Sequence, residues 1–329
     1  MTATRRLLAI HPGALGDVLQ AVPALRALRG DAGDRHLSLA AQPRLARLLA
    51  GAGVVDEALS FEALGLAALF ADDHPVPPAL AARLGAFDSI VSWFGARAPS
   101  YAARLTTLAP RVILAAPVPA EDEPTALPVW RHLLATVAPL GPSTSPVAVD
   151  AGPLRAPLAI PDEWRARGRA ALAAAGLADE RPLLVVHAGA GGPWKRWPAE
   201  RFAETIARGA DGCAVLLHEG PADREAVDAL ERRLDALGAA AGRTRLVAPE
   251  LEALAAVLAD ARAYLGGDSG ISQLAAAAGA AAIVLYPEAT LARWTPWGPR
   301  ARALPASDDG ADVEHAADTL AGLLRARPP

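Results

Sequence analysis

The stretch LLAIHPGALGDVLQAVPALRAL, residues 7–28, joins an apolar run to an amphipathic segment through a loop with one proline and two glycines. The run Leu7–Ile10 is typical of a short buried strand, and the spacing of apolar residues in 16–28 predicts a helix. Gly13 and Gly16 allow the backbone to turn sharply between the two elements. A buried strand followed directly by a helix is the beginning of a βαβ unit, so this stretch predicts an α/β fold.

Asp17 is the acid of this loop, and it lies where the helix is expected to start. Unpaired N–H groups and the positive end of the helix dipole favour a carboxylate at that point. Two interpretations remain open at this stage: Asp17 caps the helix, or it serves as a general base at a binding site. Pro23 lies inside the same helical pattern and predicts a kink, because its ring removes the hydrogen bond to residue 19.

Length and composition favour two domains in a chain of 329 residues, 52% of them hydrophobic. The net charge of −4 argues against a nucleic-acid-binding protein. Cys213 is the single cysteine, which excludes an intrachain disulfide and a thiol metal cluster, and the seven histidines show no metal-ligand spacing. No apolar stretch reaches the ~18 residues of a membrane span. The apolar region near the N-terminus is too short for a signal peptide. We therefore expect a soluble cytoplasmic protein with no metal.

Strand and helix patterns alternate along both halves of the chain, which predicts parallel sheets. The segment 138–161 is rich in proline and glycine and predicts a linker, so we expect domains at 1–150 and 151–329. A terminal helix is expected near 312–325, packed back on the first domain. Strands are expected near 37–41, 89–93, 112–115, 183–187, 214–218, 263–265 and 282–286.

The segment HAGAGGPWKRWP, residues 187–198, follows one of these predicted strands. Its glycines expose backbone N–H groups, and Lys195, the one lysine of the chain, adds an ammonium, a combination that suits a phosphate. The Gly-Lys-Ser/Thr of a Walker loop and the third glycine of the dinucleotide fingerprint are both missing. An ordinary glycine-rich turn remains the alternative.

The segment GGDSGISQLAAAAG, residues 266–279, places Asp268, Ser269 and Gly270 between a predicted strand and an alanine-rich helix. A hydroxyl, a glycine amide and a helix N-terminus at one point predict an anion site. A plain helix cap is the alternative.

Two further segments carry candidate binding residues. In LLHEGPADRE, residues 216–225, an acid at a strand end can reach a ribose hydroxyl, and Glu219 and Asp223 are the candidates. In ATLARWTPWGP, residues 289–299, Trp297 either lines a sugar or base pocket or packs in the interior.

Four segments in this order resemble glycosyltransferase family 9, the ADP-heptose:lipopolysaccharide heptosyltransferases. They are GALGDVLQAVPALRALR, KRWP, GDSGISQLAAAAG and RWTPWGP, which begin at residues 13, 195, 267 and 293. The resemblance implies a GT-B architecture, with two Rossmann-like domains facing across a cleft. It implies an inverting, metal-independent transfer of a heptose or similar sugar from an ADP-sugar to a lipopolysaccharide-core or related glycan acceptor. No cofactor is implied, and location at the inner face of the cytoplasmic membrane is left open.

By matching positions, the resemblance makes Asp17 the catalytic base of the first, acceptor-binding domain. It assigns the donor to the second domain, where Gln273 stands at the place of a family histidine and differs from it in carrying no charge. The donor-binding residues implied are Lys195, Asp268, Ser269, Gly270, Gln273, Glu219 and Asp223, and the candidates for an acceptor or sugar pocket are His11, Gly13, Gly16 and Trp297.

Two other functions stay in view. The departure at Gln273 motivates a non-catalytic nucleotide- or sugar-binding protein on the same fold. Two α/β domains alone suggest a nicotinamide oxidoreductase, against which the incomplete dinucleotide fingerprint counts.

Overall fold

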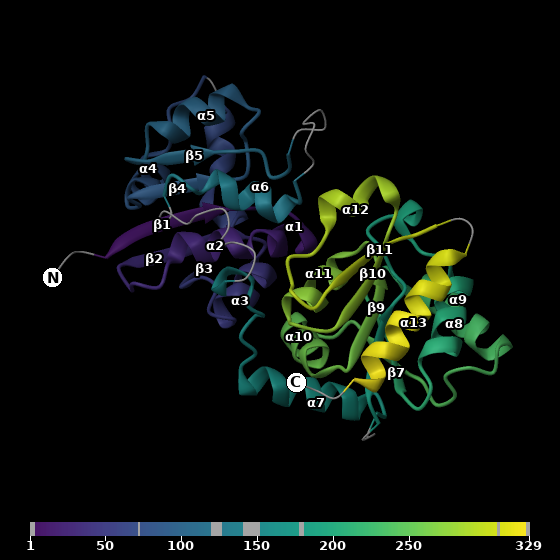
Figure 1. Ribbon diagram of the computed structural model, residues 1–329. Helices are drawn as coiled ribbons and strands as arrows, with labels where there is room; N and C mark the ends of the chain where they lie inside the picture. The colour runs from purple at the N-terminus through teal and green to yellow at the C-terminus, as the bar shows by residue number, and fades with distance from the viewer. Residues whose placement is uncertain are drawn as a thin grey trace. The chain divides into compact units, whose positions relative to one another are not determined.

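The computed structural model describes residues 4–71, 73–119, 127–140, 152–177, 181–307 and 310–326. The chain divides into two compact units, Met1–Arg155 and Ala156–Pro329, each built on one parallel sheet (Figure 1). The sequence places this boundary at 150/151, inside the segment 138–161, of which residues 141–151 lie outside the described part of the chain.

The first unit holds a five-stranded parallel sheet in the order β3-β2-β1-β4-β5. The central strand β1 pairs with β2 on one side, Leu7 opposite Leu37, and with β4 on the other, Leu7 opposite Ser89. Helices cover parallel sheets on both faces, which is why the middle of these strands is mostly apolar. The strands are β1 Arg5–Ile10, β2 Arg35–Ala41, β3 Glu57–Ser60, β4 Ser89–Ser92 and β5 Val112–Leu114.

The helix predicted over 16–28 is two helices, which meet at Ala21. Pro23 falls in the first turn of the second one, where its missing N–H costs no intrahelical hydrogen bond, so the helical pattern is interrupted near Pro23 by a new helix rather than by a kink in one helix. The helices of this unit are α1 Leu15–Gln20, α2 Val22–Arg29, α3 Pro43–Gly51, α4 Pro78–Gly85, α5 Pro99–Thr106 and α6 Val129–Thr136, with 3-10 turns η1 Glu62–Leu64, η2 Leu66–Phe70 and η4 Pro153–Arg155.

The second unit holds a six-stranded parallel sheet in the order β11-β10-β9-β6-β7-β8. Counted from its first strand, this is the order 3-2-1-4-5-6 of a dinucleotide-binding fold. The α/β class with Rossmann-like units, expected from the sequence, is confirmed. The strands are β6 Leu183–His187, β7 Ala214–Glu219, β8 Thr244–Val247, β9 Ala263–Gly267, β10 Ala282–Tyr286 and β11 Arg302–Pro305.

Helices cover both faces of this sheet (Figure 1). They are α7 Asp162–Ala174, α8 Ala199–Gly209, α9 Arg224–Ala236, α10 Leu251–Asp260, α11 Gly270–Ala277, α12 Glu288–Trp294 and α13 Ala311–Arg325, with the 3-10 turn η5 Pro193–Lys195.

The terminal helix α13 packs beside α8 of the second unit (Figure 1), whereas the sequence suggested that it packs on the first. Its apolar face, with Val313 and Leu320, joins Phe202 of α8 in one hydrophobic core. Gly209 lets the two helices approach closely, because a Cβ there would lie 2.7 Å from the carbonyl oxygen of Ala317. Burial of that apolar face decides where the helix belongs.

We expect Leu320→Ala to lower the free energy of unfolding by roughly 2–5 kcal/mol, because Leu320 is fully buried between α13 and the sheet. The measurement is urea denaturation of the purified protein. Leu237→Ala is the matched control, since Leu237 is 51% exposed and its truncation should change stability by less than about 0.5 kcal/mol. Equal effects of the two substitutions would contradict this packing.

Candidate functional site

Asp17 lies in the first turn of α1, in the loop that follows the central strand β1. Its Oδ2 accepts the N–H of Ala14 at 2.9 Å, so the carboxylate caps the helix as one of the two interpretations predicts. A carboxylate has capacity for about four hydrogen bonds, so capping and a role as proton acceptor are compatible.

Gly13 is required in this loop by close packing. A Cβ at this position would lie 2.7 Å from the Cβ of Asp17 and 2.7 Å from Cε1 of His11. The Gly13 carbonyl also accepts a hydrogen bond from Nε2 of Gln42 at 3.2 Å. Gly13 therefore fixes the position of Asp17 by its lack of a side chain.

His11 is buried beneath the same loop, with its ring 5.7 Å from that of Trp93. Its Nδ1 accepts the N–H of Gly13 at 3.2 Å, and burial lowers the pKa of His11 to about 4, so the ring is neutral at neutral pH. The sequence made His11 a candidate for lining a pocket, but a side chain only 2% exposed supports the loop from below instead.

In the second unit, Lys195 and Asp268 come together although 73 positions separate them in the sequence. Lys195 ends the turn after β6 and Asp268 directly follows β9, which is the neighbour of β6 in the sheet. The Lys195 Nζ lies 3.1 Å from Oδ2 of Asp268, which is buried. The same ammonium lies 5.2 Å from the ring centroid of Trp194 and 5.8 Å from that of Trp294. The structure thus brings two separately predicted segments together through one ion pair.

Ser269 and Gly270 begin α11 beside this ion pair. The Ser269 Oγ accepts the N–H of Ser272 at 3.1 Å, so the serine is a helix cap, as the alternative interpretation predicts. The first N–H groups of a helix have no acceptor within the helix, and they form the positive end of its dipole. An anion at this position would therefore meet the α11 backbone, beginning at Gly270, while the Ser269 hydroxyl is used in the cap.

Gln273 is buried on α11 and uses its amide within the protein. Its Nε2 donates to the carbonyl oxygen of Trp294 at 2.7 Å and to the Tyr286 hydroxyl at 3.1 Å. These hydrogen bonds link α11 to the end of α12, and the contact with the donor stays a prediction. A buried amide must satisfy its donors, and the carbonyl of Trp294 does so here.

Glu219, one of the two acids proposed for a ribose, is part of a structural ion-pair network instead. One of its carboxylate oxygens lies 2.7 Å from Arg245, which also pairs with Asp228 at 2.7 Å and with Glu231. The hydrogen bond with Glu231, followed by that with Asp228, raises the pKa of Arg245. The carboxylate of Glu219 is therefore held in an ion pair with the guanidinium of Arg245.

Asp223, the other acid, lies against the loops that follow β6 and β7. Its Oδ2 accepts the N–H of Gly220 at 3.1 Å, and a Cβ on Gly189 would lie 2.1 Å from its Oδ1. Only glycine at 189 permits this approach. Of the two candidates, Asp223 is the one at the edge of the sheet near the Lys195 loop.

A buried histidine pair, which the sequence analysis missed, lies next to Asp223. His187 and His218 follow the paired residues Val186 and Leu217 of β6 and β7, and their Nδ1 atoms are 3.0 Å apart. Burial lowers the pKa of His187 to about 4, and burial together with His187 lowers that of His218 to about 3. Both rings are neutral near pH 7, one donating to the other. The signal in the sequence was a histidine at the end of each of two adjacent strands.

Trp297 was a candidate for a sugar pocket, but it is 1% exposed and belongs to the interior of the second unit. The neighbouring Gly298 packs tightly on α11, since a Cβ there would lie 2.2 Å from the carbonyl oxygen of Ala276. Burial of the large indole surface favours this position over an open wall. Trp194, by contrast, is 66% exposed beside Lys195.

Among the described residues, no group of three or more histidines, cysteines or acids is placed to hold a metal ion. None of the described helices has the length and apolar character needed to cross a bilayer.

Comparison with family models matches residues 127–320 to glycosyltransferase family 9 (heptosyltransferase), which is more than half of the chain. Comparison with curated proteins gives no match.

Solved structures similar to this chain include the family 9 glycosyltransferase from Veillonella parvula, with a TM-score of 0.74 at 17% identity over 98% of both chains. The E. coli ADP-heptose lipopolysaccharide heptosyltransferase II has a TM-score of 0.70 at 20% identity, covering 97% of this chain and 98% of its own. The E. coli heptosyltransferase WaaC with ADP has a TM-score of 0.61 at 18% identity over the same shares. At sequence identities of 17–20%, the similarity to these structures is evidence for a shared fold alone.

We expect the free energy of unfolding to fall as the pH drops from about 6.5 toward 4, because the buried histidines stay neutral while the unfolded chain takes up protons. Each such proton contributes a slope of about 1.4 kcal/mol per pH unit. His218→Asn should reduce this slope, measured by urea denaturation between pH 4 and 8, whatever its effect on stability at pH 7. His74→Asn is the control, because His74 is exposed. An unchanged slope in His218→Asn would contradict the assignment.

Proposed function

Because the chain belongs to glycosyltransferase family 9, we propose that it transfers a heptose or a similar sugar from an ADP-linked donor to a lipopolysaccharide-core or related glycan acceptor. The observation that carries the proposal is the meeting of Lys195 and Asp268 at the N-terminus of α11. Support for the donor comes from relatives described as an ADP-heptose heptosyltransferase and as WaaC with ADP. An acceptor of this kind is lipid-linked, so the proposed place of action is the inner face of the cytoplasmic membrane.

The proposed donor site would meet an anionic leaving group with an ammonium and with backbone N–H groups. As the bond from the anomeric carbon to the phosphate oxygen breaks, ADP takes the electron pair and gains negative charge. The ammonium of Lys195 and the N–H groups at Gly270 would balance that charge in a reaction proposed to need no metal ion. Asp223 would accept hydrogen bonds from the adenosine ribose hydroxyls, next to the loops after β6 and β7.

The proposed base is Asp17 of the first unit. It would take the proton of the acceptor hydroxyl as that oxygen bonds to the anomeric carbon on the face opposite the departing ADP, which inverts the configuration. The hydrogen bond from Ala14 holds the carboxylate in place during this step. The first unit would then bind the acceptor and the second unit the donor.

The sequence left two alternative functions, a nicotinamide oxidoreductase and a non-catalytic binding protein. Membership of family 9 overturns the nicotinamide oxidoreductase. A binding protein without activity rested on Gln273, and the buried hydrogen bonds of that side chain give it a structural use that is independent of charge. ADP binding with no turnover of any ADP-sugar would favour this second candidate.

We expect Asp17→Asn to lower the rate of sugar transfer from ADP-heptose by about 100-fold or more, because the amide still accepts a hydrogen bond from Ala14 but takes up no proton. The transfer assay uses a lipopolysaccharide-core acceptor and is run with EDTA present. The Kd of Asp17→Asn for ADP should stay unchanged. Asp88→Asn is the matched control, since Asp88 also accepts a backbone N–H, that of Arg6. Normal transfer by Asp17→Asn would reduce Asp17 to a helix cap.

We expect Lys195→Met to weaken ADP binding about tenfold or more, which is the scale of one lost charge-assisted hydrogen bond. Isothermal titration calorimetry measures the change. Lys195→Arg keeps the charge next to Asp268 and should retain more affinity than Lys195→Met. Arg208→Met, on the exposed face of α8, is the control for loss of one positive charge. An ADP affinity equal to that of the unaltered protein would remove Lys195 from the donor site.

A further inference from the structure

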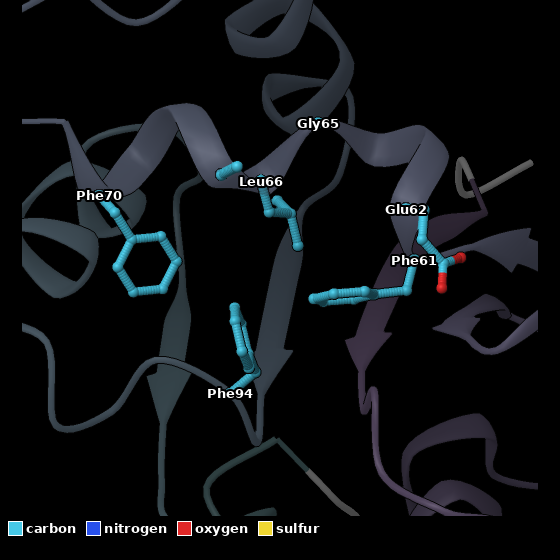
Figure 2. A pocket seen from close by; sticks show the side chains of 7 residues that line it. Phe61, Glu62, Gly65, Leu66, Phe70 and Phe94 are labelled. Carbon is cyan, nitrogen blue, oxygen red and sulfur yellow. The ribbon is translucent and has the colours of Figure 1, made fainter.

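An open apolar pocket of about 510 Å³ lies in the first unit and has no part in the chemistry described above (Figure 2). The rings of Phe61, Phe70 and Phe94 and the side chain of Leu66 surround it. We call it the phenylalanine pocket. Its volume falls in the range of small-molecule sites.

The walls of the phenylalanine pocket are almost entirely hydrocarbon. Phe94 packs edge-on against Phe61 at 5.0 Å and against Phe70 at 5.6 Å between ring centroids. The carboxylate of Glu62, the charged residue of the lining, points away from the rings and accepts a hydrogen bond from the Ser60 hydroxyl (Figure 2). An occupant therefore meets rings and methyl groups, with little to bind a hydroxyl or a phosphate.

The floor of the pocket is built rigidly by the turn after β4. Gly95 has a φ of +73° and lies so close to Tyr101 that a Cβ would be 2.3 Å from its ring. The Ser92 hydroxyl donates to the carbonyl oxygen of Phe94 at 2.9 Å and lies 3.0 Å from the Tyr101 hydroxyl. The position of Phe94 is thus fixed before any ligand arrives, which reduces the entropy lost on binding.

The phenylalanine pocket lies at the same edge of the sheet as the loop of Asp17. Phe94 follows β4, which pairs with β1, and the N–H of the intervening Trp93 donates to the carbonyl oxygen of Ile10 at 3.0 Å. The Trp93 ring packs on His11, which in turn underlies Gly13 and Asp17. The pocket and Asp17 are therefore joined through two neighbouring strands and the Trp93–His11 contact.

From this lining and this place we propose that the phenylalanine pocket binds a single hydrocarbon chain of the acceptor. The inference rests on the proposed function, because it assigns the ligand to the acceptor. An uncharged alkyl chain is complementary to a wall that offers apolar surface and one outward carboxylate. Phe70 is 40% exposed, so an entering chain removes aromatic surface from water.

The test uses n-octyl β-D-glucopyranoside below its critical micelle concentration, with methyl β-D-glucopyranoside as the probe that has the same sugar and no chain. Calorimetry should detect binding of the octyl compound alone. Phe70→Asp should weaken this binding about tenfold or more, because it puts a charge where the chain lies. Ala67→Trp, which fills the pocket and keeps its walls, should weaken it as well. Leu237→Asp alters an exposed apolar residue of the second unit and should leave it unchanged.

Four results would overturn the proposal. Equal binding of the two glucosides would identify a sugar site instead. No binding of the octyl compound, or binding that neither pocket variant weakens, would leave the pocket without this ligand. Self-association of the unaltered protein that Phe70→Asp abolishes, with no alkyl binding, would make it a contact between two copies of the chain.

The Kd for ADP, measured on the same samples, separates this inference from the proposed function. Octyl binding without ADP binding would count against the glycosyltransferase donor site and leave the pocket assigned to an alkyl chain. ADP binding without octyl binding would overturn the pocket alone.

Discussion

The order of strands in each parallel sheet is the constraint on which both candidate sites depend. In each unit the order reverses beside the first strand, between β1 and β4 and between β6 and β9. The two strands at such a reversal point continue into helices on opposite faces of the sheet. The loops after them therefore separate and expose backbone groups at the carboxyl ends of the strands. Asp17 follows β1 and Phe94 follows β4, while Lys195 and Asp268 follow β6 and β9. The residues that carry the proposed chemistry are therefore placed by topology before any side chain makes a contact.

Burial then separates the residues that hold these loops from those that remain for a ligand. Gln273 and Glu219 are both buried and both hydrogen-bonded within the second unit, where an unsatisfied polar group would be costly. Glycine has the opposite role, because its missing side chain lets a carboxylate approach the backbone. Asp17 lies against Gly13 in this way, and Asp223 lies against Gly189. These two acids are held at the edges of their sheets by packing against glycine and by a backbone N–H, that of Ala14 for Asp17 and that of Gly220 for Asp223.

The sequence predicted the features that depend on local pattern. The alternation of strands and helices, the break caused by Pro23 and the loop positions of Asp17, Lys195 and Asp268 all follow from residue spacing and backbone preference. Contacts between segments far apart in the chain could not be predicted from the sequence. The partner of Glu219 is Arg245, on the neighbouring strand β8, and pairing between strands has to be known before that ion pair is visible. The place of α13, the burial of Trp297 and the His187–His218 pair are of the same kind, since each depends on which elements pack together.

The two units differ in the kind of surface they offer at their reversal points. The second offers an ammonium, a helix N-terminus and an acid, which suit a nucleoside diphosphate that carries both negative charge and hydroxyl groups. The first offers a carboxylate and, at the same edge of the sheet, a pocket of aromatic rings, which would suit the proposed acceptor hydroxyl on a molecule with an apolar part. One fold thus supports opposite recognition chemistry because the sheet fixes where the loops emerge, and the loop residues alone decide charge and polarity. Substitutions in the loops should therefore alter the choice of ligand while leaving the sheets intact, as expected when function is carried by sites placed on a common scaffold.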